Sequence, residues 1–178
     1  AADVTFADGA DIITASAGTS NVRIGEGAGD SIASGGNYNV VIGTDAGTTL
    51  STADGNVLIG YQAGTLMDTG QRTVAIGYKA FDEATTGSDS VVVGYEAGHS
   101  VTTGIENTFL GYYAGSETTD SAYNTFVGAS TGQENTTGAG NTGVGARALD
   151  AVTTVSNLTA VGYNALSANT TGTNSVAV

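Results

Sequence analysis

Short apolar runs recur along this chain at a nearly constant spacing, and a glycine closes each run. The first step, from Gly25 to Gly43, is 18 residues long, and every later step as far as Gly162 is 17 residues long. A fixed period of this kind is the signature of a repeat architecture. Val, Ile and Thr dominate the runs and favour β-strands, whereas a glycine after each run opposes a helix. We therefore expect one short strand in each repeat.

A unit of 17 residues is too short for a repeated pair of helices, which needs about 34. It suits one turn of an all-β parallel β-roll or solenoid, in which successive coils stack about 4.8 Å apart. About ten such coils would make a rod of roughly 45 Å. The predicted organisation is a β-roll repeat domain over 21–178, preceded by an irregular N-terminal coil or cap over 1–20.

Two rows of side chains are expected to share one face of the strands. The residue before each closing glycine is aliphatic throughout, and the residue two positions earlier is Val or Thr. Residues two apart in a strand point to the same face, so we predict that both rows point into the core. The predicted structural core row is Ile24, Ile42, Ile59, Ile76, Val93, Leu110, Val127, Val144, Val161 and Val178.

The middle residue of each run faces the other way, and it too is mostly apolar. A lone solenoid would carry polar side chains there, and contiguous exposed apolar surface usually marks an interface. We predict a subunit interface at Val41, Leu58, Val92, Phe109 and Phe126. In the competing hypothesis the chain's own T-T-G segment folds back over this row and the rod is monomeric.

The repeat resembles a known family. The stretch from Asn157 to Gly172, NLTAVGYNALSANTTG, is similar to the head repeats of YadA-type trimeric adhesins, in the longer version found in phage tail fibres and bacterial surface proteins. Residues 174–178, NSVAV, resemble the family's N-S-V-A-[IV]-G motif. The resemblance covers about residues 21–178 and implies a left-handed parallel β-roll assembled as a homotrimer. The first coil departs from the pattern through its 18-residue step and Arg23.

Charge and composition narrow the possible partners. Seventeen acidic residues stand against four basic ones, and the net charge of −13 opposes binding to nucleic acid or to anionic lipid surfaces. The chain has no Cys, which excludes disulfides and thiolate metal sites. Because no apolar run approaches 18 residues, we expect no membrane insertion. The start at Ala1 suggests a fragment of a longer chain.

Few residues suggest catalysis. His99, the only histidine, precedes Ser100 in a polar turn that no other repeat copies. Asp82 and Glu83 form the one adjacent acidic pair, but neighbours in one turn do not flank a glycosidic bond as a glycosidase requires. The glycine-rich segment 25–29 lacks the spacing of a phosphate loop. We therefore expect no enzyme activity, no catalytic or metal-binding residues and no cofactor.

Two further rows are candidates for binding. Tyrosines follow several closing glycines and are weak candidates for a sugar-binding array: Tyr61, Tyr78, Tyr95, Tyr112 and Tyr163. Adjacent Thr pairs precede other glycines, but ice-binding arrays need T-x-T on one strand face, because adjacent strand residues point oppositely. Turn formation is the simpler interpretation of the Thr pairs.

These patterns favour a structural or adhesive segment of a trimeric extracellular fibre, with a phage tail fibre or similar virion appendage as the first hypothesis. The expected partners are other copies of this chain and a host-surface glycan or protein. The head of a bacterial trimeric autotransporter adhesin, on the cell surface, is the alternative. An ice-binding solenoid is a more distant one.

Overall fold

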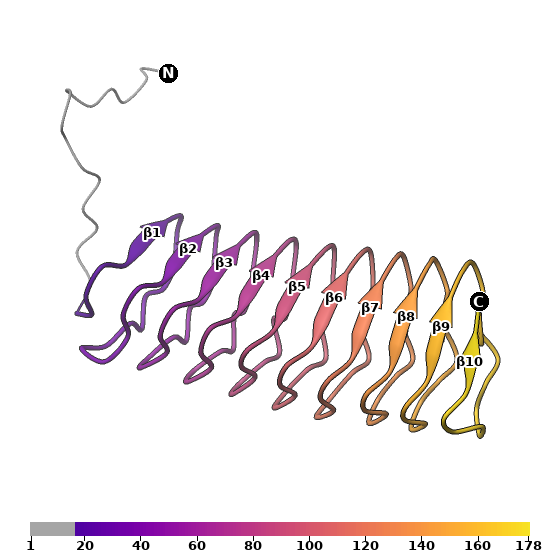
Figure 1. Ribbon diagram of the computed structural model, residues 1–178. Coiled ribbons are helices and arrows are strands. Elements are labelled where there is room, and N and C mark those ends of the chain that lie inside the picture. Colours follow the sequence, from indigo (N-terminus) through magenta and orange to yellow (C-terminus); the bar gives the residue numbers. More distant parts are fainter. Residues whose placement is uncertain (1–16) are drawn as a thin grey trace, which may run out of the picture.

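Ten short strands form one parallel sheet in which each strand pairs with the next along the chain (Figure 1). The computed structural model describes residues 17–178. The strands are β1 (Val22–Ile24), β2 (Val40–Ile42), β3 (Val57–Ile59), β4 (Val74–Ile76), β5 (Val91–Val93), β6 (Thr108–Leu110), β7 (Thr125–Val127), β8 (Thr142–Val144), β9 (Thr159–Val161) and β10 (Val176–Ala177). The predicted all-β solenoid is confirmed, with ten strands and about nine turns. Left-handedness and trimeric assembly remain predictions.

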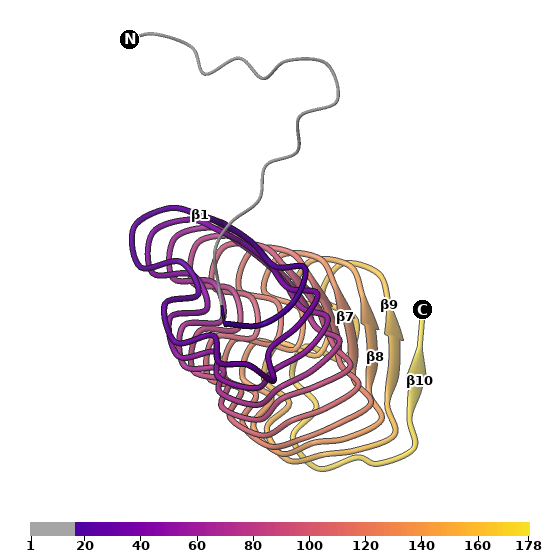
Figure 2. The same cartoon turned by 90° about the vertical axis from the view of Figure 1, so that its left-hand side faces the viewer.

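Each coil consists of a strand and the loop that leads to the next strand, and coil 4 is the one that begins with β4. Equivalent residues lie beside one another in adjacent coils, so that Ala75 pairs with Val92 and Val92 with Phe109. The coils keep a similar outline along the stack (Figure 2). The tight corner after β3 depends on Gly60, which has φ +133° and lies against the backbone of Gly77. A side chain at Gly60 would collide with that backbone, which explains the glycine at each strand end.

The middle residue of each strand points into the coil, which contradicts the sequence-based assignment. Val41, Leu58, Val92, Phe109 and Phe126, predicted as a subunit interface, are 0% exposed in the single chain. They belong to one core cluster with residues of the loop, so the chain's own return segment covers them. The competing hypothesis is confirmed in one respect, because the chain itself covers this row. Its monomeric rod stays an untested prediction.

The loop contributes two further rows to that core. One is the small-residue row that includes Ala63, Ala80 and Ala97, and the other includes Leu50 and Met67. The core is thus closed within each coil and continuous between coils. It requires no second chain.

The predicted core row faces outward, and this prediction was wrong. Of its members, Ile24 is 48% exposed, Val144 and Val161 are each 38% exposed, and the remainder are half-buried or exposed. The prediction failed because three consecutive apolar residues make both faces of the strand apolar, so alternation alone does not identify the inner face. The full misplaced row is Ile24, Ile42, Ile59, Ile76, Val93, Leu110, Val127, Val144, Val161 and Val178.

Buried asparagines before the strands connect neighbouring coils. The Asn56 side-chain oxygen accepts a hydrogen bond from the Thr73 backbone N–H at 2.9 Å, and its amide donates to the Gly70 carbonyl at 2.9 Å. Asn39, Asn107, Asn124 and similar residues make equivalent bonds one coil away. The row satisfies backbone groups that the short strands leave unpaired.

The predicted N-terminal coil or cap at 1–20 lies mostly outside the described residues. The repeat region 21–178 forms the single sheet. Within residues 17–178 no helix is long and apolar enough to cross a membrane.

Candidate functional site

The outer face of the sheet is an apolar strip that runs the length of the stack. It combines the row before the closing glycine with the row two residues earlier, and none of these side chains is fully buried. In β3 to β5 both rows are aliphatic, for example Val74 with Ile76 and Val91, 40% exposed, with Val93. From β6 to β9 the earlier row becomes Thr. We call this surface the outer strip.

A ladder of tyrosines borders the outer strip, separated from it by the closing glycine. The rings of Tyr61, Tyr78, Tyr95 and Tyr112 stack at centroid distances of 5.2, 5.0 and 5.3 Å. Tyr78 and Tyr95 therefore carry a neighbouring ring on both faces, and a sugar cannot stack on either. Tyr163, also predicted for ligand binding, is not part of this stack and is 72% exposed.

Glu96 and burial raise the pKa of two tyrosines, Tyr95 in the ladder and Tyr113 beside it. A hydrogen bond with Glu96 raises the pKa of Tyr95, with partial burial adding to the shift. Burial and the nearby charge of Glu96 raise the pKa of Tyr113 to about 12. The ring of Tyr113 packs edge-on to that of Tyr112, with 4.4 Å between the ring centroids. The phenols of Tyr95 and Tyr113 therefore remain neutral at ordinary pH, which suits them to packing and hydrogen bonding.

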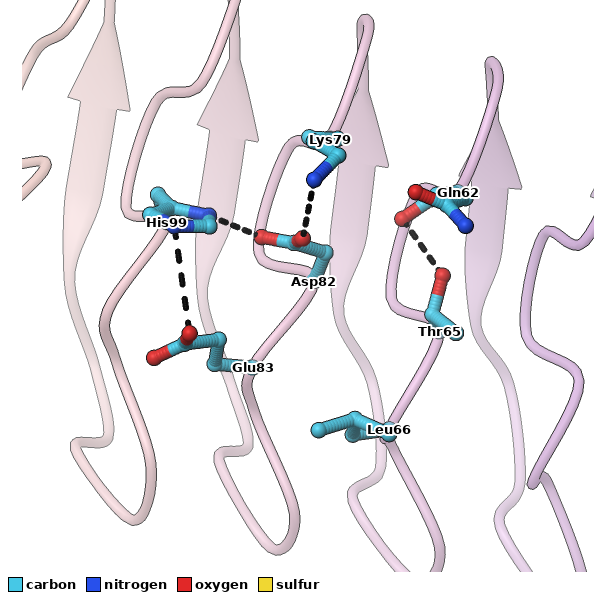
Figure 3. A pocket seen from close by; sticks show the side chains of 7 residues that line it. All are labelled: Gln62, Thr65, Leu66, Lys79, Asp82, Glu83 and His99. Atoms are coloured by element: carbon cyan, nitrogen blue, oxygen red, sulfur yellow. Dashed lines mark hydrogen bonds and ion pairs between the residues drawn. The ribbon is translucent and has the colours of Figure 1, made fainter.

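A polar hollow of about 350 Å³ opens at a corner of coils 3 to 5 (Figure 3). It is built by side chains at matching places in successive coils, and Asp82 is separated from His99 by one repeat of 17 residues. The lining consists of Gln62, Thr65, Leu66, Lys79, Asp82, Glu83 and His99. We call this site the corner hollow.

Asp82 and His99 form the centre of the corner hollow. The His99 Nδ1 atom is hydrogen-bonded to Asp82 Oδ1, and its Nε2 atom lies 3.8 Å from a Glu83 carboxylate oxygen. The Lys79 ammonium nitrogen lies 4.0 Å from Asp82 Oδ2. Burial raises the pKa of Asp82, and the hydrogen bond from His99 acts in the opposite direction.

This arrangement is a hydrogen-bonded bridge between coils rather than a nucleophilic relay. Both ring nitrogens of His99 face carboxylates, and the Thr65 hydroxyl donates to the Gln62 carbonyl at 2.8 Å. In the described part of the chain no group of three or more His, Cys, Asp or Glu side chains could hold a metal ion.

The corner hollow was not predicted as one site, although its parts were noticed. Sequence reasoning treats the Asp82 and Glu83 pair separately from His99, because His99 lies one repeat further along the chain. The signal that would have joined Asp82 to His99 is the repeat itself, which places residues 17 apart side by side.

Comparison with protein-family models, curated proteins and solved structures found no match to this chain.

Proposed function

We propose that this chain is a rigid segment of a homotrimeric extracellular fibre, and we favour a phage tail fibre or similar appendage that contacts a host surface. The observation that carries the proposal is the outer strip. Contiguous exposed apolar surface usually marks an interaction site in a soluble protein. The strip repeats with every coil, so the surface that matches it best has the same period. A second copy of this chain supplies such a surface.

The proposed interface differs from the one expected from the sequence. It uses the row of Ile59, Ile76 and Val93 together with the Val or Thr row, and not the middle row around Phe109. Fully burying one such aliphatic side chain is worth about 1.5–3 kcal/mol, and the gain recurs in every coil. The resemblance to YadA-type head repeats supports three copies rather than two.

The remaining properties suit a fibre that contacts a surface. Each coil is hydrogen-bonded to its neighbours through backbone and buried asparagine groups, as in the Asn56 to Thr73 bond. In such a quasi-one-dimensional stack each coil supports the next. In a trimer formed through the outer strip, the loops outside the strip would be available to a host glycan or protein.

The head of a bacterial trimeric autotransporter adhesin is the alternative, and it predicts the same trimer. The flanking sequence in the full-length gene distinguishes the two. A membrane-barrel segment indicates the adhesin, whereas a virion-attachment or chaperone-protease domain indicates the phage fibre. Ice binding would need the outer strip as a free surface. The absence of thermal hysteresis in a solution of the protein would exclude this hypothesis.

Small-angle X-ray scattering tests the fibre proposal. A trimeric rod has a larger cross-section than one solenoid at nearly the same length, and its scattering mass is three times that of one chain. We expect the trimeric cross-section at micromolar concentration. Scattering from single, folded solenoids would refute the proposal.

A further inference from the structure

The corner hollow is built from a combination of side chains that the other described coils do not repeat. Lys79 and Asp82 have counterparts four repeats later in Arg147 and Asp150, whose Nε and Oδ2 atoms lie 3.5 Å apart. There, however, Ser167 takes the place of His99 in the following coil. The hollow is therefore a local feature added to a regular scaffold.

The polar groups around the hollow retain unused hydrogen-bonding capacity. The Asp82 side chain is only 10% exposed, and its Oδ2 atom lies 4.0 Å from the Lys79 ammonium, beyond hydrogen-bond distance. A carboxylate accepts up to about four hydrogen bonds. Within the described residues the side-chain amide of Gln62 has no hydrogen-bond partner. Acceptors and donors thus converge on one space.

We propose that the corner hollow binds one neutral sugar residue, such as a hexose at the end of a surface glycan. This assignment deepens the proposed adhesive function and rests on it. The carboxylates of Asp82 and Glu83 would accept hydrogen bonds from sugar hydroxyls, and the Lys79 ammonium and Gln62 amide would donate to sugar oxygens. Leu66, 47% exposed at the rim, provides an apolar contact for the C–H face of the ring.

Size and charge exclude other ligand classes. A volume of about 350 Å³ is at the lower end of small-molecule pockets, roughly 300–1,000 Å³. The lining is polar, which disfavours a purely apolar ligand. Two carboxylates against one ammonium, in a chain of net charge −13, repel acidic sugars and phosphates. The carboxylates of Asp82 and Glu83 approach different nitrogens of His99 and do not converge as metal ligands.

His99 makes the proposal directly testable, because it is the only histidine in the chain. In protein labelled with ¹³C at histidine, its ring signal needs no assignment and reports on the hollow. The signal is followed while glucose, galactose, mannose or N-acetylglucosamine is added, with N-acetylneuraminic acid and calcium chloride as separate arms. An affinity of about millimolar is expected of so small a ligand.

The variants are Asp82→Asn and the matched control Asp150→Asn. We expect a saturable shift of the His99 signal with at least one neutral sugar, and none with N-acetylneuraminic acid or calcium. Asp82→Asn should weaken binding about tenfold or more, because a hydroxyl loses a charged acceptor. Asp150→Asn should bind like the wild type.

Three results would overturn the proposal. They are the absence of a shift with every neutral sugar, a saturable shift with calcium or N-acetylneuraminic acid alone, and unchanged sugar affinity in Asp82→Asn. Molar mass is measured on the same samples. A trimer without a sugar shift rejects only the sugar site, whereas a folded monomer with a sugar shift rejects only the fibre.

Discussion

The ring of Phe109 lies against Gly115, six residues later in the same coil, where an added Cβ atom would come within 2.9 Å of the ring carbons. In coil 4 the two positions exchange sizes. The strand carries the small Ala75, and Phe81, fully buried, stands where other coils have glycine. Gly143 with Leu149, and Ala160 with Leu166, repeat the exchange. In coils 2 to 9 one of these two positions thus carries Val, Leu or Phe, and the other carries Gly or Ala.

This exchange predicts strong coupling between Ala75 and Phe81. Phe81→Gly should destabilise the chain by about 3–5 kcal/mol through the cavity it leaves. Ala75→Phe alone should destabilise it by about 1–3 kcal/mol through overpacking. The double variant recreates the Phe109 and Gly115 arrangement. Its loss of stability should be much smaller than the sum of the losses in the two single variants. Urea denaturation gives the three free energies of unfolding, and simple additivity would contradict the coupling.

The same exchange explains how much of the fold was predictable from the sequence. The 17-residue period predicted every strand and its pairing partner, because parallel coils repeat in register. The inner face was assigned wrongly because strands such as Val57–Ile59 are apolar on both faces. The deciding signal was not alternation but the inverse sizes of residues six apart, such as Ala75 and Phe81. The corner hollow escaped prediction because its side chains come from three coils.

The buried asparagines should contribute more to stability than their polar character suggests. Asn56→Ala leaves the Thr73 N–H and the Gly70 carbonyl without their partners. Each buried unsatisfied group costs about 1–3 kcal/mol, so we expect a loss of about 2–5 kcal/mol. Thr69→Ala, at an exposed corner of the next coil, should change stability by less than about 0.5 kcal/mol. Equal effects of the two substitutions in thermal or urea unfolding would show that the asparagine row is not structural.

Asp82 should lower the stability of the fold above the pH range in which it ionises. Burial raises its pKa above 3.8, so the folded state holds the proton more tightly than the unfolded state. Its favourable contribution is present below 3.8 and is lost as pH rises through the folded-state pKa. The side chain in Asp82→Asn stays neutral. The free energy of unfolding of this variant, minus that of the wild type, should therefore increase from pH 3 to pH 8. The other carboxylates titrate in both proteins, so their contributions largely cancel in the difference between the two free energies of unfolding. A pH-independent difference, or one of opposite sign, would contradict the raised pKa.

Strand residues on the inner and outer faces of the sheet should respond in opposite ways to a charge. Phe109→Asp places a carboxylate in the closed core and should unfold the coils around it, since an unpaired buried charge costs several kcal/mol. Ile76→Asp changes the outer strip and should leave each chain folded while preventing its association. Circular dichroism reports folding and light scattering reports mass for both variants. A folded Phe109→Asp protein, or an unfolded Ile76→Asp protein, would contradict the assignment of the two faces.

The molar mass of the wild-type chain in solution tests the proposed trimer most directly. Sedimentation equilibrium over a range of concentrations gives the mass without assuming a shape. We expect three times the chain mass of 17.4 kDa, retained at micromolar concentration and reduced to a single chain by Ile76→Asp. A wild-type chain that remains folded at the mass of one copy would show that the outer strip is not an interface between copies of this chain.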